Sequence, residues 1–271
     1  MSIKSLKKTW DFLGKTDPLW AILTAPDKKG NKWELEEFFR TGGVEVRGVL
    51  EYIASLGFSL PQGKALDFGC GVGRLTQALA PHFDEVDGVD ISPSMIALAE
   101  TYNRHAGRCK YYLNDRDSLV LFEDHEFAFI YSNITLQHME PRYSKKYLKE
   151  FLRVLAPGGL LVFQLPSHPR EPQTGHRGFR QRIKRLVPPS LIHLVRSIKG
   201  PRQPIIEMHS IPREELARFL TQQGGTILDI SPDPYAGEEW VSFRYCVTKN
   251  WGLPGRCLPQ RSDLRAGGEI N

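Results

Sequence analysis

The fold is decided by one stretch of the sequence, Ala65-Leu66-Asp67-Phe68-Gly69-Cys70-Gly71-Val72-Gly73-Arg74-Leu75. Its apolar residues before Gly69 predict a buried strand, and its alternating glycines predict a tight turn that opens a helix near Arg74. Glycine permits positive φ and lets the main chain approach a ligand without a Cβ in the way. A dinucleotide fingerprint would need a further glycine three positions after Gly71, where this chain has Arg74. The stretch therefore predicts a ligand-binding strand–turn–helix unit and disfavours a dinucleotide.

Two acids accompany this turn. Asp67 stands two residues before Gly69, where it would repel a pyrophosphate and attract an ammonium group. Asp90 ends the next expected strand, where a carboxylate accepts hydrogen bonds from ribose hydroxyls. Each acid also has a structural interpretation, since Asp67 could cap the turn and Asp90 could cap the helix near Pro93. The two acids together with the glycines favour the ligand-binding interpretation.

Strands and helices alternate along the chain from residue 64. Short apolar runs predict strands at 64–68, 85–90, 109–113, 127–132 and 160–165, and helical spacing predicts helices at 44–56, 74–80, 93–104 and 143–155. A helix at 212–223 and an antiparallel pair of strands at 226–230 and 241–248 complete the series. Such alternation is typical of a doubly wound sheet. The sequence therefore predicts an α/β fold with a seven-stranded mixed sheet and helices on both faces.

Four motifs in this order resemble those of one enzyme family. The Rossmann-like class I methyltransferases, which use S-adenosylmethionine, have motifs similar to Leu66-Asp67-x-Gly-x-Gly-x-Gly and to Gly88-Val89-Asp90-Ile91-Ser92-Pro93-Ser94-Met95. Their adenine-contacting turn is similar to Asn114-Asp115-Arg116, and the helix-turn before their fifth strand is similar to Leu152-Arg153-Val154-Leu155-x-Pro-Gly-Gly. The resemblance covers residues 60–165 and returns at 205–248. It implies that the chain binds S-adenosylmethionine and transfers its methyl group.

The resemblance implies a set of cofactor contacts at the carboxyl ends of the strands. The residues expected to make them are Asp67, Phe68, Gly69, Cys70, Gly71, Gly73, Asp90, Ile91, Ser92, Met95, Asn114, Asp115, Arg116, Ser132 and Asn133. Asp117 is an alternative to Asp115, because a shift of one or two residues would exchange them. S-adenosylmethionine presents an ammonium and carries no phosphate, which agrees with an acid at position 67.

The methyl acceptor is expected near the loop that follows the fourth strand, since ligands of open α/β sheets bind beyond the carboxyl ends of the strands. His138 is the candidate general base, because a histidine of near-neutral pKa can take a proton from an attacking hydroxyl. Its alternative role is to bond the loop backbone and shape the pocket. Gln137 is expected to contact the substrate. The loop lacks the Asn/Asp-Pro-Pro-aromatic run of DNA-modifying enzymes, and the chain lacks a Pro-Cys pair, so no nucleic-acid partner is expected.

Positive charge is concentrated in one part of the chain. The protein has 271 residues and a formal net charge of +5, yet nine arginines and lysines and a single acid lie between Pro166 and Gln203. We expect an inserted helical cap at 166–207, after the fifth strand, with cationic outer faces. Three roles are open for it: a solvated lid, a clamp for an anionic acceptor with Arg180 as a substrate contact, or contact of 177–199 with an anionic membrane.

The first 43 residues are rich in aromatic side chains and are expected to form an N-terminal helical lid. Trp33 and Phe39 are the expected substrate contacts in it, and the alternative is that they belong to the core. The methyltransferase domain is expected at 44–250 and a flexible tail at 251–271. No apolar run approaches the roughly 20 residues of a membrane span, and no signal peptide is recognisable, so we expect a cytoplasmic protein. The four cysteines lack metal-site spacing, and no metal is expected.

The expected activity is methyl transfer to an oxygen of a small or lipid-linked metabolite, such as a sugar hydroxyl or an anionic acceptor. Two alternatives stay open at this point. One is N-methylation of a small amine, which needs no strong base if the amine is already neutral. The other is a non-catalytic partner or regulatory protein that binds S-adenosylmethionine.

Overall fold

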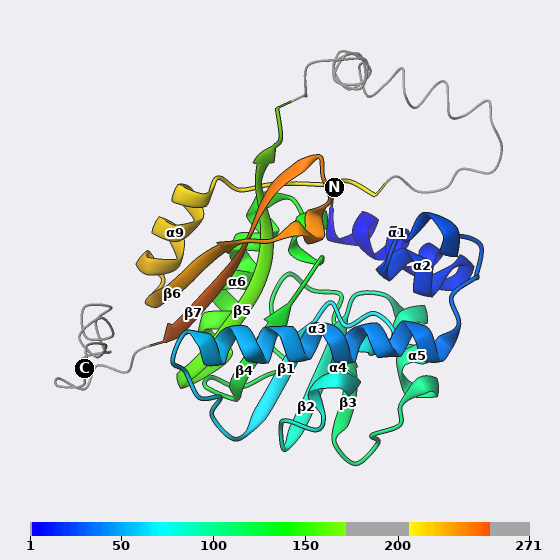
Figure 1. Ribbon diagram of the computed structural model, residues 1–271, viewed down its shortest axis with the longest axis horizontal. Helices are drawn as coiled ribbons and strands as arrows, with labels where there is room; N and C mark the ends of the chain where they lie inside the picture. Colours follow the sequence, from blue (N-terminus) through cyan, green and yellow to red (C-terminus); the bar gives the residue numbers. More distant parts are fainter. Residues whose placement is uncertain (1, 172–205, 250–271) are drawn as a thin grey trace, which may run out of the picture.

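A mixed sheet organises the chain (Figure 1). The computed structural model describes residues 2–171 and 206–249, and within them the strands lie in the order β3-β2-β1-β4-β5-β7-β6. Their bounds are β1 Lys64–Phe68, β2 Glu85–Asp90, β3 Cys109–Leu113, β4 Phe127–Ser132, β5 Leu155–Pro169, β6 Gly225–Pro232 and β7 Trp240–Lys249. The first five strands pair parallel, and β7 pairs antiparallel with both β5 and β6. The predicted seven-stranded mixed sheet is confirmed.

Helices cover both faces of this sheet. Their bounds are α1 Ile3–Thr16, α2 Pro18–Ile22, α3 Leu35–Ser55, α4 Arg74–Leu79, α5 Pro93–Tyr102, α6 Pro141–Val154 and α9 Arg213–Gln222, with short 3₁₀ turns at η1 Pro26–Lys28, η2 Leu136–His138 and η3 Pro234–Ala236. Apolar side chains of α3 and α4 pack with one face of the sheet, and those of α6 and α9 pack with the other. The chain order reverses between β1 and β4, which is the switch point where open α/β sheets bind ligands.

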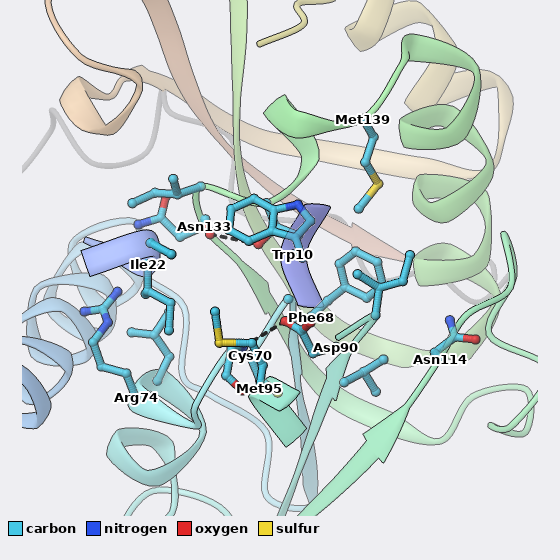
Figure 2. Close-up of a pocket in the computed structure, with 18 of the residues that line it drawn as sticks. Trp10, Ile22, Phe68, Cys70, Arg74, Asp90, Met95, Asn114, Asn133 and Met139 are labelled. Carbon is cyan, nitrogen blue, oxygen red and sulfur yellow. Dashed lines mark hydrogen bonds between the residues drawn. The ribbon is translucent and has the colours of Figure 1, made fainter. Parts of the chain in front are cut away.

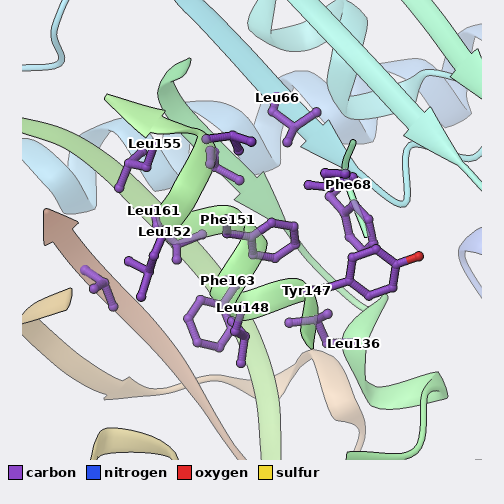
Figure 3. Close-up of a cluster of buried hydrophobic side chains, with 14 of the residues drawn as sticks. Leu66, Phe68, Leu136, Tyr147, Leu148, Phe151, Leu152, Leu155, Leu161 and Phe163 are labelled. Carbon is purple, nitrogen blue, oxygen red and sulfur yellow. The ribbon is translucent and has the colours of Figure 1, made fainter. Parts of the chain in front are cut away.

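The two cores follow from the period-two alternation of the strands. On β5, Leu161 and Phe163 join the core beneath α6 and α9, whereas Val162 joins the core beneath α3 and α4. Figure 3 shows the first of these cores, in which the rings of Phe68, Tyr147 and Phe151 meet. The ring centroids of Phe68 and Tyr147 are 4.5 Å apart. This core therefore ties α6 to the end of β1, directly below the glycine turn.

The largest departures from the predicted ranges are in β5 and α3. β5 runs to Pro169 instead of residue 165, because the ladder with β7 continues to the pair Pro169↔Trp240. α3 begins at Leu35 instead of residue 44, so the expected lid boundary at residue 43 falls inside a continuous helix. A Cβ added to Gly42 would lie 2.5 Å from the Arg74 carbonyl oxygen, so glycine here lets α3 approach the start of α4.

Parts of two sequence predictions lie outside the described residues. These are residues 172–205 of the basic insert, including Arg180, and the tail at 251–271. In the part of the chain that the structure describes, no helix combines the length and apolar character that crossing a membrane requires.

Candidate functional site

The glycine turn links β1 to α4 at the carboxyl edge of the sheet. Gly69, Gly71 and Gly73 all have positive φ, at +81°, +53° and +83°. The amides of Gly69 and Cys70 donate to the carbonyl of Val89 at 2.8 and 3.0 Å, which ties the turn to the end of β2. A Cβ on Gly69 would lie 2.2 Å from Thr135 Oγ1. The turn therefore requires glycine both for its backbone conformation and for its contact with the loop after β4.

Asp90 lies at the end of β2 and bonds the same turn. Its Oδ2 accepts a hydrogen bond from the Gly71 amide at 3.0 Å, and its Oδ1 accepts one from the Ser92 amide at 2.8 Å. Burial raises the pKa of the Asp90 carboxyl above its ordinary value, against these backbone donors, which lower it. Asp90 is thus a fixed acceptor between the glycine turn and the start of α5.

A pocket opens above this edge of the sheet and holds about 870 Å³ of empty space, part of it open to solvent. Nine of the expected cofactor residues line it: Phe68, Gly69, Cys70, Gly71, Asp90, Ile91, Met95, Asn114 and Asn133. In Figure 2, Arg74 and Asn133 lie on one side of the pocket with Ile22, Asn114 lies on the other, and Asp90 lies between them. The structure therefore brings together residues that lie far apart in the sequence, from the first motif to the loop after β4.

Asp67 lies elsewhere than the sequence motif suggests. Period-two alternation directs its side chain to the face covered by α4, where its Oδ2 accepts from Thr76 Oγ1 at 2.7 Å. The residue is 1% exposed and is not among those that line the pocket. Burial raises the pKa of this carboxyl to about 7. Its geometry matches the structural interpretation, in which the acid holds the turn and the start of α4 together.

Five more expected cofactor residues are not among those that line the pocket; they are Gly73, Ser92, Asp115, Arg116 and Ser132. Ser92 caps α5 by accepting from the Met95 amide at 3.2 Å. Asp115 is exposed and pairs with Lys7 at 2.9 Å, and the Arg116 carbonyl accepts from the Tyr147 hydroxyl. Ser132 Oγ donates to the Phe68 carbonyl at 3.0 Å. A direct ligand contact stays a prediction for each of the five.

A buried ionic network, which the sequence did not reveal, lies at one side of the pocket. Glu45 of α3 accepts from Arg74 Nη2 at 2.9 Å, from the Tyr131 hydroxyl at 2.9 Å and from Asn133 Nδ2 at 2.7 Å. Arg74 and Asn133 line the pocket, and both they and Glu45 are less than 9% exposed. Among the described residues, Arg74 Nε and Asn133 Oδ1 have no hydrogen-bond partner. The network therefore leaves one donor and one acceptor unpaired at this side.

Comparison with known proteins agrees with the geometry of this edge. A family model described as a methyltransferase domain matches residues 65–159, which run from β1 to the start of β5. Residues 65–159 belong to the methyltransferase domain family. This segment contains the glycine turn, Asp90 and the loop after β4, so the family predicted from the four motifs is confirmed.

The relatives and the solved structure that resemble this chain are themselves methyltransferases. Trans-aconitate 2-methyltransferase of Methylobacterium nodulans is 28% identical over 151 residues, which are 55% of each chain. Demethylmenaquinone methyltransferase of Staphylococcus saprophyticus is 35% identical over 112 residues, 40% of this chain and 47% of that protein. The chain thus spans about half the length of the curated relatives that it matches. Magnesium protoporphyrin IX methyltransferase of Synechocystis, solved with bound SAH (S-adenosylhomocysteine), shares the fold with a TM-score of 0.61 at 15% identity, over 92% of this chain and all of that one.

The first two helices form a wall of the pocket in front of the methyltransferase domain. Leu6 and Trp10 of α1 and Ala21 and Ile22 of α2 line the pocket. A Cβ on Gly71 would lie 2.5 Å from Ile22 Cδ1, so α2 packs directly on the glycine turn. The aromatic leader was the only signal for this wall in the sequence, and it did not indicate which residues face the ligand.

Trp33 and Phe39, the expected substrate contacts of the leader, pack against the apolar cluster that contains Phe38 and Met95, and they are not among the residues that line the pocket. Trp33 Nε1 donates to the Leu23 carbonyl at 3.1 Å, and the Phe39 ring packs edge-on against Tyr102. These contacts match the core interpretation of both residues.

His138 follows β4 in the 3₁₀ turn η2 and is 8% exposed. Its Nδ1 bonds the Glu207 carbonyl at 3.0 Å, its Nε2 lies 3.3 Å from Gln137 Nε2, and its ring meets Trp10 edge-on. Burial lowers the pKa of His138 to about 4. Both ring nitrogens therefore have protein partners, and the ring is neutral near pH 7.

Gln137 is buried and bonds inward instead of lining the pocket. Its Oε1 accepts from Gln164 Nε2 at 3.2 Å, and Gln164 Oε1 accepts from the Ile134 amide at 3.3 Å. Ile134 lines the pocket with φ at +57°, a conformation that a β-branched residue rarely adopts. Such strain costs on the order of 1–3 kcal/mol and persists where surrounding contacts enforce it. The Gln137–Gln164 pair thus holds a strained backbone at the pocket.

Proposed function

We propose that this protein transfers a methyl group from S-adenosylmethionine to a carboxylate oxygen of a small anionic molecule. The observation that carries the cofactor assignment is the order of polar groups along the pocket: Arg74 and Asn133 at one side, Asp90 in the middle and Asn114 at the other. The acceptor class follows from the environment of His138 and from the charge of the chain.

The polar groups of the pocket fit the cofactor from end to end. The Arg74 Nε–H suits its carboxylate, and Asn133 Oδ1 suits its ammonium, because both atoms are buried without a partner among the described residues. Leaving such groups unpaired costs about 1–3 kcal/mol each, which a ligand would offset. In this proposal Asp90 would accept from the ribose hydroxyls and Asn114 would lie beside the adenine, which agrees with the positions of both residues in the pocket.

When bound, S-adenosylmethionine supplies a methyl group on an activated sulfonium leaving group. The residues of this chain then have to hold the acceptor oxygen in line with that methyl carbon and keep water away from it. Trp10 and Ile22 close the pocket from the leader side, and the strained Ile134 lines it near the loop after β4. Their role is to position the acceptor against the methyl group. Positioning supplies the larger part of catalysis for a reaction whose leaving group needs no activation.

A carboxylate acceptor removes the need for a general base. It attacks as an anion at neutral pH, whereas a hydroxyl has to lose a proton. His138 has both ring nitrogens engaged and a pKa lowered to about 4, so its geometry supports the pocket-shaping role. The excess of arginines and lysines between Pro166 and Gln203 favours an anionic acceptor. Trans-aconitate, which the name of one relative gives as its substrate, is a carboxylate of this kind.

The test is methylation with isotopically labelled S-adenosylmethionine against a panel of di- and tricarboxylates, sugars and amines. A carboxyl methyl ester releases labelled methanol in mild alkali, whereas methyl ethers and methylamines keep the label. We expect alkali-labile label on a carboxylate. Alkali-stable label on a sugar or an amine would contradict the acceptor class, and cofactor binding without turnover on extracts would support a non-catalytic role.

A further inference from the structure

The buried Glu45 carboxylate bonds two side chains that line the pocket, Arg74 and Asn133, and one polar atom of each is left without a partner among the described residues. It accepts from the Nη2 group of Arg74 and from the Nδ2 group of Asn133. An amide whose nitrogen is bound in this way directs its oxygen elsewhere. Arg74 Nε and Asn133 Oδ1 are the atoms left without partners among the described residues.

We propose that Glu45 is a positioning residue that sets the polarity of the pocket for the amino-acid end of the cofactor. With Glu45 bonded to both side chains, Arg74 has a donor left for a carboxylate and Asn133 has an acceptor left for an ammonium. Without it, the Asn133 amide is free to turn its nitrogen toward the ammonium, which would place donor against donor. The inference rests on the proposed function, since it assumes a ligand with a zwitterionic end.

Three features hold Glu45 in this role. Gly42 lies one turn before Glu45 on α3. Because glycine has no Cβ, the helix can pack against the Arg74 backbone at this point. The Tyr131 hydroxyl at the end of β4 donates a third hydrogen bond to Glu45 at 2.9 Å. The ion pair with Arg74 joins side chains that are only 4% and 3% exposed, so solvent screens it little. The carboxylate is therefore fixed from three elements, α3, α4 and β4.

The experiment compares two ligands that differ only at the end in question. S-adenosylhomocysteine carries the zwitterionic amino-acid group, whereas 5′-methylthioadenosine has the same nucleoside and sulfur without it. Calorimetry on the purified full chain gives the dissociation constant of each. We expect Glu45→Gln to weaken S-adenosylhomocysteine about 10- to 100-fold, the range for hydrogen bonds to charged groups. The affinity for 5′-methylthioadenosine should change less than about threefold. Glu51→Gln, an exposed position on the same helix, should change neither affinity.

If Glu45→Gln fails to fold, Glu45→Asp replaces it in the experiment. Aspartate keeps the charge that pairs with Arg74, but its side chain is one methylene shorter. It should show the same selective loss at smaller size. An equal loss for both ligands would make Glu45 merely structural and overturn the inference, as would unchanged binding of both. Equal affinity of the wild-type chain for the two ligands would overturn the inference and leave the cofactor assignment standing. Wild-type binding of neither ligand would overturn both.

Discussion

The floor and the wall of the pocket are built in different ways. The floor is the glycine turn with Asp90, in which residues 69–71 and 89–92 are joined by backbone hydrogen bonds and by the Asp90 carboxylate. The wall is made of Leu6, Trp10, Ala21 and Ile22, which reach the pocket through packing of α1 and α2. Asp11 fixes α1 to α5 by accepting from the Ser94 amide at 3.1 Å.

The difference shows which part of the site has a strict residue requirement. The floor needs glycine, because other residues adopt the positive φ of the turn only with strain. It needs aspartate at position 90, because the carboxylate has to reach the amides of the turn. The wall needs only apolar side chains of suitable volume, so many sequences would serve. Ligand affinity should therefore respond more strongly to changes in the floor than to changes in the wall.

The largest effect is expected at Asp90. Asp90→Ala removes the acceptor for the Gly71 and Ser92 amides and for a ribose, and should raise the dissociation constant of S-adenosylhomocysteine about 10- to 150-fold. Calorimetry measures it, with Asp124→Ala as the control, because that acid is exposed and pairs with Arg153. The control should stay within about threefold of wild type. Similar losses in the two variants would contradict the distinction between the floor and the solvent-exposed turn.

A smaller effect is expected at Trp10. Trp10→Ala removes a half-buried ring from the wall. Loss of its apolar contact with the ligand should cost about 1–2 kcal/mol and weaken the binding of S-adenosylhomocysteine about 5- to 30-fold. Phe12→Ala is the matched control, since this ring lies on the same helix and is 41% exposed. Unchanged binding in Trp10→Ala would mean that α1 covers the pocket without contributing to affinity.

The smallest effect on turnover is expected at His138. His138→Gln should keep kcat within about threefold, whereas loss of a general base costs ~10²–10⁴. With its pKa at about 4, the wild-type ring contributes no rising limb near pH 6.5 to the rate profile. A limb near pH 6.5 that disappears in the variant would reinstate His138 as the base and a hydroxyl as the acceptor.

The same histidine should make folding sensitive to acid. Its folded pKa lies below the value of about 6.5 for an unfolded histidine, so the unfolded chain binds the proton first. The stability due to the neutral ring is complete above pH 6.5 and declines as the pH falls toward 4. The free energy of unfolding, measured with urea, should therefore fall more between pH 7 and pH 5 for wild type than for His138→Gln. Equal drops would indicate that the ring is not buried as a neutral group.

Most of the fold was predictable because local patterns encode it. Strands β1 to β4 match the predicted ranges, since each is a short apolar run bounded by turn residues. The end of β5 was not predictable, because pairing with β7 extends it beyond its own apolar run. The start of α3 was missed because Gly42 and Gly43 resemble a break, although the first serves a close contact with α4.

The sequence by itself determined the floor of the site: the glycine turn, Asp90 and the family of the domain follow from residues that are close along the chain. Only the tertiary structure decided the direction of Asp67, the wall around Trp10 and the partnership of Glu45 with Arg74 and Asn133. The physical reason is the range of the interactions. A turn and its acid are fixed by backbone geometry over a few residues, whereas Glu45 and Asn133 are 88 residues apart and meet only when α3 packs on the sheet.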